Sequence, residues 1–237
     1  MSAYVLVHGA WHGGWCWEKV VSLLRKTGYE VEAPDLPGHG KDKTPIREVS
    51  LQAYADSICK ILDAQPEPVI LVGHSMGGVV ITQAAEYRPE KVRTLVYLTA
   101  YLLRNGESIA QGAQRDTESL LPPNLVFSED SSYCTVKDEV IRETFYGDCS
   151  DEDVARAMSL IVPQSASPFL TPVDISEQNF GRIPRIYIEC LRDRAVCPSE
   201  QKKMYTDLPC ERVISMNTSH SPFLSAPQEL VAHLTSL

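Results

Sequence analysis

Short apolar segments rich in β-branched residues alternate along the chain with segments whose apolar residues recur at helical spacing. This alternation is typical of parallel strands joined by crossover helices. It predicts helices at residues 15–27, 51–63 and 76–87, and a last helix near residues 227–234. It also predicts six strands, at residues 3–7, 29–33, 68–72, 92–98, 185–189 and 212–215. The pattern therefore favours an α/β fold built on a parallel sheet of about six strands.

One connection, between the fourth and fifth predicted strands, is much longer than a crossover helix requires. It contains several prolines and two amphipathic segments, at residues 136–145 and 151–161. Ligands of open parallel sheets bind beyond the carboxyl ends of the strands. We therefore interpret residues 101–181 as a lid over that edge, inserted into a core domain of residues 1–100 and 182–237.

Residues 68–85 contain no charged side chain, and their length approaches that of a membrane span. Glycines and polar residues divide the segment, which favours a buried strand, a turn and a helix. The turn holds Ser75 in the sequence Gly-His-Ser-Met-Gly. A strand-turn-helix context around Gly-x-Ser-x-Gly is what a nucleophile elbow requires. The alternative is a chance match in a loop, because only three positions of the motif are fixed.

A serine nucleophile needs a base and a group that orients the base. His220 follows the last predicted strand, and Asp193 follows the fifth. The chain order Ser75, Asp193, His220 is the order found in hydrolases of this kind. The structural alternatives are a surface loop around His220 and a simple surface pairing of Asp193 with Arg192 or Arg194.

The oxyanion of such a reaction needs two amide donors. One is expected from Met76, the residue after the nucleophile, and the other from Ala10 in the glycine-rich segment after the first strand. That segment could instead be only a tight turn, and it lacks the glycine spacing of nucleotide-binding loops. A substrate pocket is expected from large apolar residues that could equally be lid packing: Trp11, Tyr133, Met158, Leu160 and Phe169.

Composition narrows the class of protein. The 237 residues suit one domain with an insertion, and 43% hydrophobic with 22% charged residues is ordinary for a globular chain. A formal charge of −9 argues against a nucleic-acid partner. The seven cysteines include no Cys-x-x-Cys pair, and no basic leader precedes the first strand, so we expect a reducing, cytoplasmic location. We expect no membrane association, metal or cofactor.

The sequence resembles the α/β-hydrolase superfamily, and within it the group of plant methylesterases and hydroxynitrile lyases. The resemblance covers nearly the whole chain and is most specific at residues 5–15, 69–78, 180–195 and 219–227. It implies helices on both sheet faces and a helical cap. It also implies the nucleophile, acid, base and oxyanion amides already identified from the residues.

The sequence also differs from this group of enzymes at several points. The lid is shorter than in the plant enzymes, and the chain begins on the strand before the oxyanion loop. The lyase branch carries a threonine at the position of Gly9 and a lysine at the position of Ser221, so both residues favour an esterase. The expected function is a serine carboxylesterase that hydrolyses small-molecule esters. The alternatives are a hydroxynitrile lyase, an acyltransferase or a ligand receptor on the same fold, and a homodimer is compatible with each.

Overall fold

The computed structural model describes residues 3–237, and it confirms the α/β fold and the six-stranded parallel sheet. The strand order is β2-β1-β3-β4-β8-β9. Every pairing within this sheet is parallel. The strands are β1 (Tyr4–Val7), β2 (Val31–Glu32), β3 (Val69–His74), β4 (Val92–Leu98), β8 (Arg185–Cys190) and β9 (Arg212–Met216).

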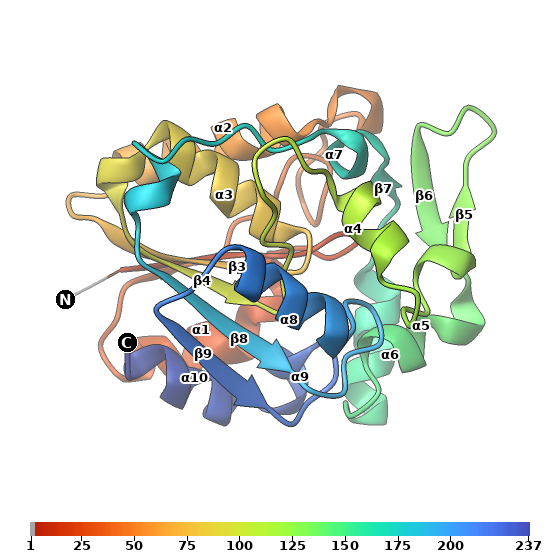
Figure 1. The fold of residues 1–237 in the computed structure, drawn as a ribbon. Coiled ribbons are helices and arrows are strands. Elements are labelled where there is room, and N and C mark those ends of the chain that lie inside the picture. The colour runs from red at the N-terminus through yellow and green to blue at the C-terminus, as the bar shows by residue number, and fades with distance from the viewer. Residues whose placement is uncertain (1–2) are drawn as a thin grey trace.

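Helices cover both faces of this sheet, as Figure 1 shows, with α2 and α3 on one face and α1 and α10 on the other. The core helices are α1 (Glu18–Lys26), α2 (Leu51–Ala64), α3 (Gly77–Tyr87), α8 (Pro198–Asp207), α9 (Pro222–Ser225) and α10 (Pro227–Thr235). All six residues of β3 are buried, because the strand is central in the sheet and covered on both sides. Among residues 3–237, no helix is long and apolar enough to cross a membrane.

Two predicted elements are much shorter in the structure. The helix expected at residues 15–27 begins as a 3₁₀ turn, Gly14–Trp17, and only α1 is α-helical. The strand expected at residues 29–33 is reduced to β2, since only Tyr4 and Val5 of β1 pair with it. Further 3₁₀ turns lie at Ile46–Glu48, Pro89–Lys91, Pro122–Asn124 and Phe180–Arg182.

The segment between β4 and β8, which we call the cap, is only partly helical. Its helices are α4 (Ile109–Arg115), α5 (Asp138–Phe145), α6 (Asp151–Leu160) and α7 (Ser167–Leu170). It also contains a three-stranded antiparallel sheet, which the sequence analysis did not predict. The strands of that sheet are β5 (Leu125–Phe127), β6 (Tyr133–Val136) and β7 (Gln164–Ser165), too short to show a clear periodicity. The β5–β6 hairpin extends away from the core sheet in Figure 1.

Candidate active site

Ser75 lies at the carboxyl end of β3, in the turn that leads into α3. Its backbone has φ +54°, in the left-handed region that a non-glycine residue rarely adopts. The Ser75 carbonyl accepts hydrogen bonds from the amides of Gly78, at 3.0 Å, and Tyr101, at 3.1 Å. These bonds hold the turn in its strained conformation, which is the local geometry expected of a nucleophile elbow.

Two glycines of this turn allow the strand and the helix to approach closely. A Cβ added at Gly73 would lie 2.6 Å from the carbonyl oxygen of Gly77. A Cβ added at Gly77 would lie 2.7 Å from the carbonyl oxygen of Val7 in β1. Because backbone atoms cannot move aside, any side chain at either position would push the elbow away from the sheet.

His220 and Asp193 form a buried pair. His220 Nδ1 lies 2.6 Å from Asp193 Oδ2, and the two residues are 1% exposed each. Asp193 Oδ1 accepts the amides of Ala195, at 2.7 Å, and Val196, at 3.0 Å. The Thr99 hydroxyl donates to Asp193 Oδ2. Each neighbour of the carboxylate is therefore a donor, which makes His220 Nδ1 the protonated ring nitrogen and leaves Nε2 as the basic one.

His74 connects the elbow with the loop that carries His220. Its Nε2 lies 2.8 Å from the carbonyl oxygen of His220, and the two ring centroids are 4.5 Å apart. Burial holds the pKa of His74 well below its ordinary value, so the ring is neutral and Nε2–H donates this bond. The sequence analysis placed His74 inside the motif but did not predict this contact. Because His74 directly precedes Ser75, the contact holds the His220 loop against the serine turn.

The expected oxyanion donors, Ala10 and Met76, both line the cavity beside Ser75. Within residues 3–237, neither amide donates a hydrogen bond to another protein group. Trp11, directly after Ala10, has φ +61°. Each expected donor is therefore next to a residue in the left-handed region, since Ala10 precedes Trp11 and Met76 follows Ser75.

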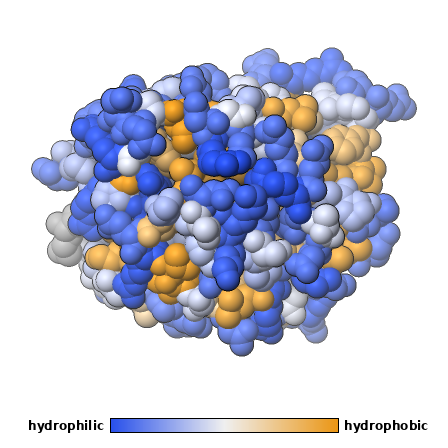
Figure 2. Space-filling view, viewed as in Figure 1, coloured by the Kyte–Doolittle hydropathy of each residue, from blue (hydrophilic) through white to orange (hydrophobic). Residues whose placement is uncertain are grey.

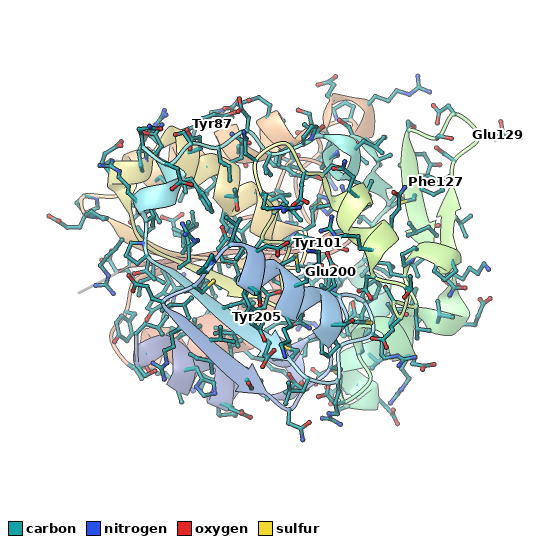
Figure 3. The ribbon with its side chains drawn as sticks, viewed as in Figure 1. Tyr87, Tyr101, Phe127, Glu129, Glu200 and Tyr205 are labelled. Atoms are coloured by element: carbon teal, nitrogen blue, oxygen red, sulfur yellow. The ribbon has the colours of Figure 1, made fainter. Side chains whose placement is uncertain are left out.

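The cavity beside Ser75 has a volume of about 320 Å³ and no charged side chain in its wall. Figure 3 shows two of its residues, Tyr101 near the centre of the molecule and Phe127 on the β5–β6 hairpin. Phe127 is 52% exposed and Leu170 is 66% exposed, so they mark the mouth of the cavity. Figure 2 shows a hydrophobic area over the same hairpin.

Two of the residues expected in the pocket, Trp11 and Phe169, line this cavity. Tyr133 lies in β6 and does not reach it, and Met158 is 39% exposed on α6. Leu160 lines a separate surface depression beside Trp15. These three residues do not line the cavity beside Ser75, because the type of an apolar residue does not determine the direction in which it packs.

No group of three or more histidine, cysteine, aspartate or glutamate side chains within residues 3–237 is arranged to hold a metal ion.

Asp35 accepts the amides of Gly14, at 2.7 Å, and Lys41, at 2.9 Å. These bonds close the turn after β2 and hold it against Gly14, so Asp35 has a structural role.

The buried histidines predict a loss of stability in acid. Burial lowers the pKa of His12 to about 4 and holds those of His8 and His74 well below the ordinary value. Between about pH 6.5 and the folded-state pKa, the unfolded chain binds protons that the folded chain does not. The contribution of these histidines to the free energy of unfolding is therefore fully present above about pH 6.5. It is lost as the pH decreases, and for His12 alone the loss is roughly 3 kcal/mol.

Urea unfolding followed from pH 7 to pH 4.5 measures this loss. The His12→Gln variant should show a shallower decline, since glutamine can replace both hydrogen bonds of the ring without titrating. The control is His233→Asn in α10, for which the free energy of unfolding should decline with pH as in the wild-type protein. A free energy of unfolding that is constant over this range would contradict the prediction.

The chain is similar to known enzymes along its whole length. The sequence profile of the alpha/beta hydrolase family matches residues 4–233. A pyrethroid hydrolase of Sphingobium wenxiniae is 35% identical over 235 residues, which cover 95% of this chain and 84% of that protein. Methylesterase 2 of Arabidopsis thaliana is 32% identical over 251 residues, which cover 99% of this chain and 95% of that protein. The chain spans only 61% of the length of a chloroplastic relative from the same plant, with 33% identity.

The solved structure of tomato methylketone synthase I with 2-tridecanone is also similar. It matches with a TM-score of 0.89 and 26% identity, over 99% of this chain and 96% of that one.

Proposed function

Because the chain belongs to the alpha/beta hydrolase family, we propose that it is a serine carboxylesterase that uses Ser75, His220 and Asp193. The observation that carries the proposal is the buried pair of His220 and Asp193, held beside a strained serine turn. The relatives named as a methylesterase and a pyrethroid hydrolase support ester hydrolysis as the reaction class.

In the proposed mechanism, Ser75 Oγ attacks the ester carbonyl carbon while His220 Nε2 takes the hydroxyl proton. The negative charge that forms on the carbonyl oxygen is stabilised by the amides of Ala10 and Met76. As the carbon–oxygen bond breaks, the imidazolium returns the proton to the departing alkoxide, and an acyl group remains on Ser75. A water molecule then attacks that ester with His220 again as base, releasing the acid and restoring the serine. Asp193 orients the ring and stabilises its charged form.

The cavity favours esters without a formal charge. A charged group brought into an apolar wall would lose its hydration without finding a partner. The substrate class that fits is therefore an uncharged carboxylic ester with an apolar acyl or alcohol part.

Lyase chemistry is the main competing function, and two positions argue against it. Gly9 has no hydroxyl, and a Cβ there would lie 2.8 Å from Ser75 Cβ. Ser221 carries no charge and is fully buried. A Gly9→Thr exchange would therefore displace the nucleophile, and Ser221→Lys would bury a cation. We therefore do not expect these two exchanges alone to give this chain lyase activity.

The proposed function is tested with a panel of short p-nitrophenyl esters, aryl methyl esters and bulky pyrethroid-like esters, together with mandelonitrile. We expect hydrolysis of the esters and no cyanide release above the uncatalysed rate at mildly acidic pH. Cyanide release with poor ester turnover would favour the lyase. Tight ligand binding without turnover of any ester would favour a receptor.

The mouth of the cavity predicts how substrate length affects the rate. Phe127→Ser should leave kcat/KM for p-nitrophenyl acetate unchanged and lower it about tenfold for p-nitrophenyl octanoate, since only a long chain reaches the mouth. Val126 is 46% exposed on the same strand but does not line the cavity, so Val126→Ser is the matched control. An equal effect of both exchanges, or an effect on the acetate, would contradict the prediction.

A further inference from the structure

Residues 145–149 run from the last residue of α5 into the loop before α6, and they contact the loops that carry Ala10, Asp193 and His220. We propose that this segment is a clamp that aligns the oxyanion, acid and base loops, with Tyr146 and Asp148 as its positioning residues. The inference rests on the proposed function. It gives the cap a role in the chemical step in addition to covering the cavity.

Asp148 joins the acid loop to the base loop. Its carboxylate accepts the Ser219 hydroxyl at Oδ1 and the Ser219 amide at Oδ2, the latter at 2.9 Å. Arg192 Nη2 lies 3.1 Å from the same Oδ2. Ser219 directly precedes His220, and Arg192 directly precedes Asp193. One cap carboxylate therefore holds the residues next to both members of the buried pair.

The partners of Asp148 reinforce this junction. Arg192 also donates to the carbonyl of Asn217, at 2.7 and 3.1 Å, so its guanidinium bridges the cap and the base loop. The Asp148 side chain is only 13% exposed, so water competes little for its two bonds with Ser219, whereas the Arg192 side chain is 54% exposed. The bonds to Ser219 have a charged acceptor and are therefore stronger than bonds between neutral groups.

Tyr146 reaches the oxyanion loop through His12. Its hydroxyl lies 2.7 Å from His12 Nε2, and His12 Nδ1 lies 2.8 Å from the carbonyl oxygen of Ala10. A carbonyl can only accept, so Nδ1 carries the ring hydrogen and Nε2 accepts from the tyrosine. Tyr146 and His12 are buried, at 0% and 1% exposure. The chain of bonds fixes the Ala10 carbonyl and with it the peptide between Ala10 and Trp11, directly after the proposed donor.

The other residues of the segment complete the contacts. The Phe145 ring lies 5.7 Å from the rings of both His220 and Trp11. The Cys149 thiol faces the carbonyl of Ser221, at 4.0 Å. A displacement of about 1 Å in catalytic groups can cost a hundredfold in rate. A segment that packs on both sides of the base and on the oxyanion loop is therefore placed to control the chemical step.

The Asp148 arm is tested with Asp148→Ala, which removes the acceptor for both loops. We expect kcat for p-nitrophenyl butyrate to fall about 10- to 100-fold with KM unchanged, because the cavity wall is intact. Asp148→Asn should recover most of kcat, since an amide can accept the Ser219 amide and donate to its hydroxyl. Asp151, whose side chain is 92% exposed in α6, supplies the control Asp151→Ala. If Asp148→Ala does not fold, Ser219→Ala, which removes one bond, replaces it with an expected fall of about threefold.

The Tyr146 arm is tested with Tyr146→Phe, which removes only the hydroxyl. We expect kcat and the affinity for a trifluoromethyl ketone, which forms an oxyanion on Ser75, to fall by the same factor of about ten. Affinity for an uncharged alcohol product should stay at the wild-type value. Tyr133→Phe, in the cap but outside the cavity, is the control.

The clamp hypothesis would be overturned if Asp148→Ala and Tyr146→Phe both kept the wild-type kcat. It would also be overturned if these exchanges changed only KM. Ser75→Ala is measured beside them to separate the two hypotheses. If Ser75→Ala is inactive and both clamp variants are fully active, only the clamp fails. If Ser75→Ala retains wild-type turnover, the proposed function fails and the clamp with it.

Discussion

Ser75→Ala is expected to lower kcat for activated esters by a factor on the order of 10⁶, which is comparable to removing the nucleophile of a serine protease. The covalent path requires an oxygen at this position, and no other hydroxyl is placed to replace it at the turn after β3. An alanine has the same backbone preferences as the serine it replaces at φ +54°, so the fold and the thermal unfolding midpoint should be unchanged. Steady-state hydrolysis of p-nitrophenyl butyrate, measured to the background rate, gives the factor.

Ser131→Ala is the matched control for this exchange. Ser131 lines the same cavity and also has φ +54°, but it lies in the β5–β6 hairpin, away from the elbow. We expect it to retain wild-type kcat. An organophosphate should add one covalent group to the wild-type and to Ser131→Ala proteins, and none to Ser75→Ala. Residual turnover of a tenth or more in Ser75→Ala would show that another group is the nucleophile.

Asp193→Asn is expected to lower kcat by about 10⁴, the loss known for the equivalent exchange in a serine protease. The reason lies in the neighbours of the carboxylate, which are all donors: the amides of Ala195 and Val196, the Thr99 hydroxyl and His220 Nδ1. The single oxygen of an asparagine must accept the two backbone amides, which cannot rotate. Its NH₂ group then faces His220 and forces Nδ1 to accept, so Nε2 carries the hydrogen and cannot act as a base.

Asp116→Asn tests whether the effect is specific to Asp193. Asp116 is also a buried carboxylate on the same side of the core, and it accepts the amide of Cys197 at 2.7 Å. Its Oδ1 has no partner within residues 3–237, so an amide is tolerated there. We expect near-wild-type kcat for Asp116→Asn. Equal losses in both variants would indicate that the charge of the region matters and that the orientation of His220 does not.

The sheet and the candidate groups at its edge could be predicted because they depend on chain order. Ser75, Asp193 and His220 each follow a strand, and the carboxyl ends of parallel strands meet at one edge. The contacts that support them could not be predicted in the same way. Thr99 follows β4 and bonds to Asp193, a contact that the sequence analysis did not predict. Nothing in a local pattern indicates which donor a buried carboxylate will meet.

The cap was predicted less well than the core for a related reason. The amphipathic periods of α5 and α6 identified those helices to within two residues at each end. The strand β7 is defined by its pairing with β6, which lies far before it in the chain, and β5 is only three residues long, too short to show a period. The direction of Tyr146 and Asp148 toward the core loops also depends on how the cap docks, and their residue types alone favour a surface position.

The position of the cap between β4 and β8 also has a consequence for folding. These strands pair in register, from Leu95 with Arg185 to Leu98 with Ile188, although the whole cap separates them in the chain. Closing so long a loop costs entropy before any contact is gained, and such pairings form slowly. The elbow belongs to the part with shorter connections, β1, β3 and β4, whereas Asp193 and His220 arrive with β8 and β9. In refolding, ester turnover should therefore recover later than helix content, because the last strands to dock lead into the loops of the proposed acid and base.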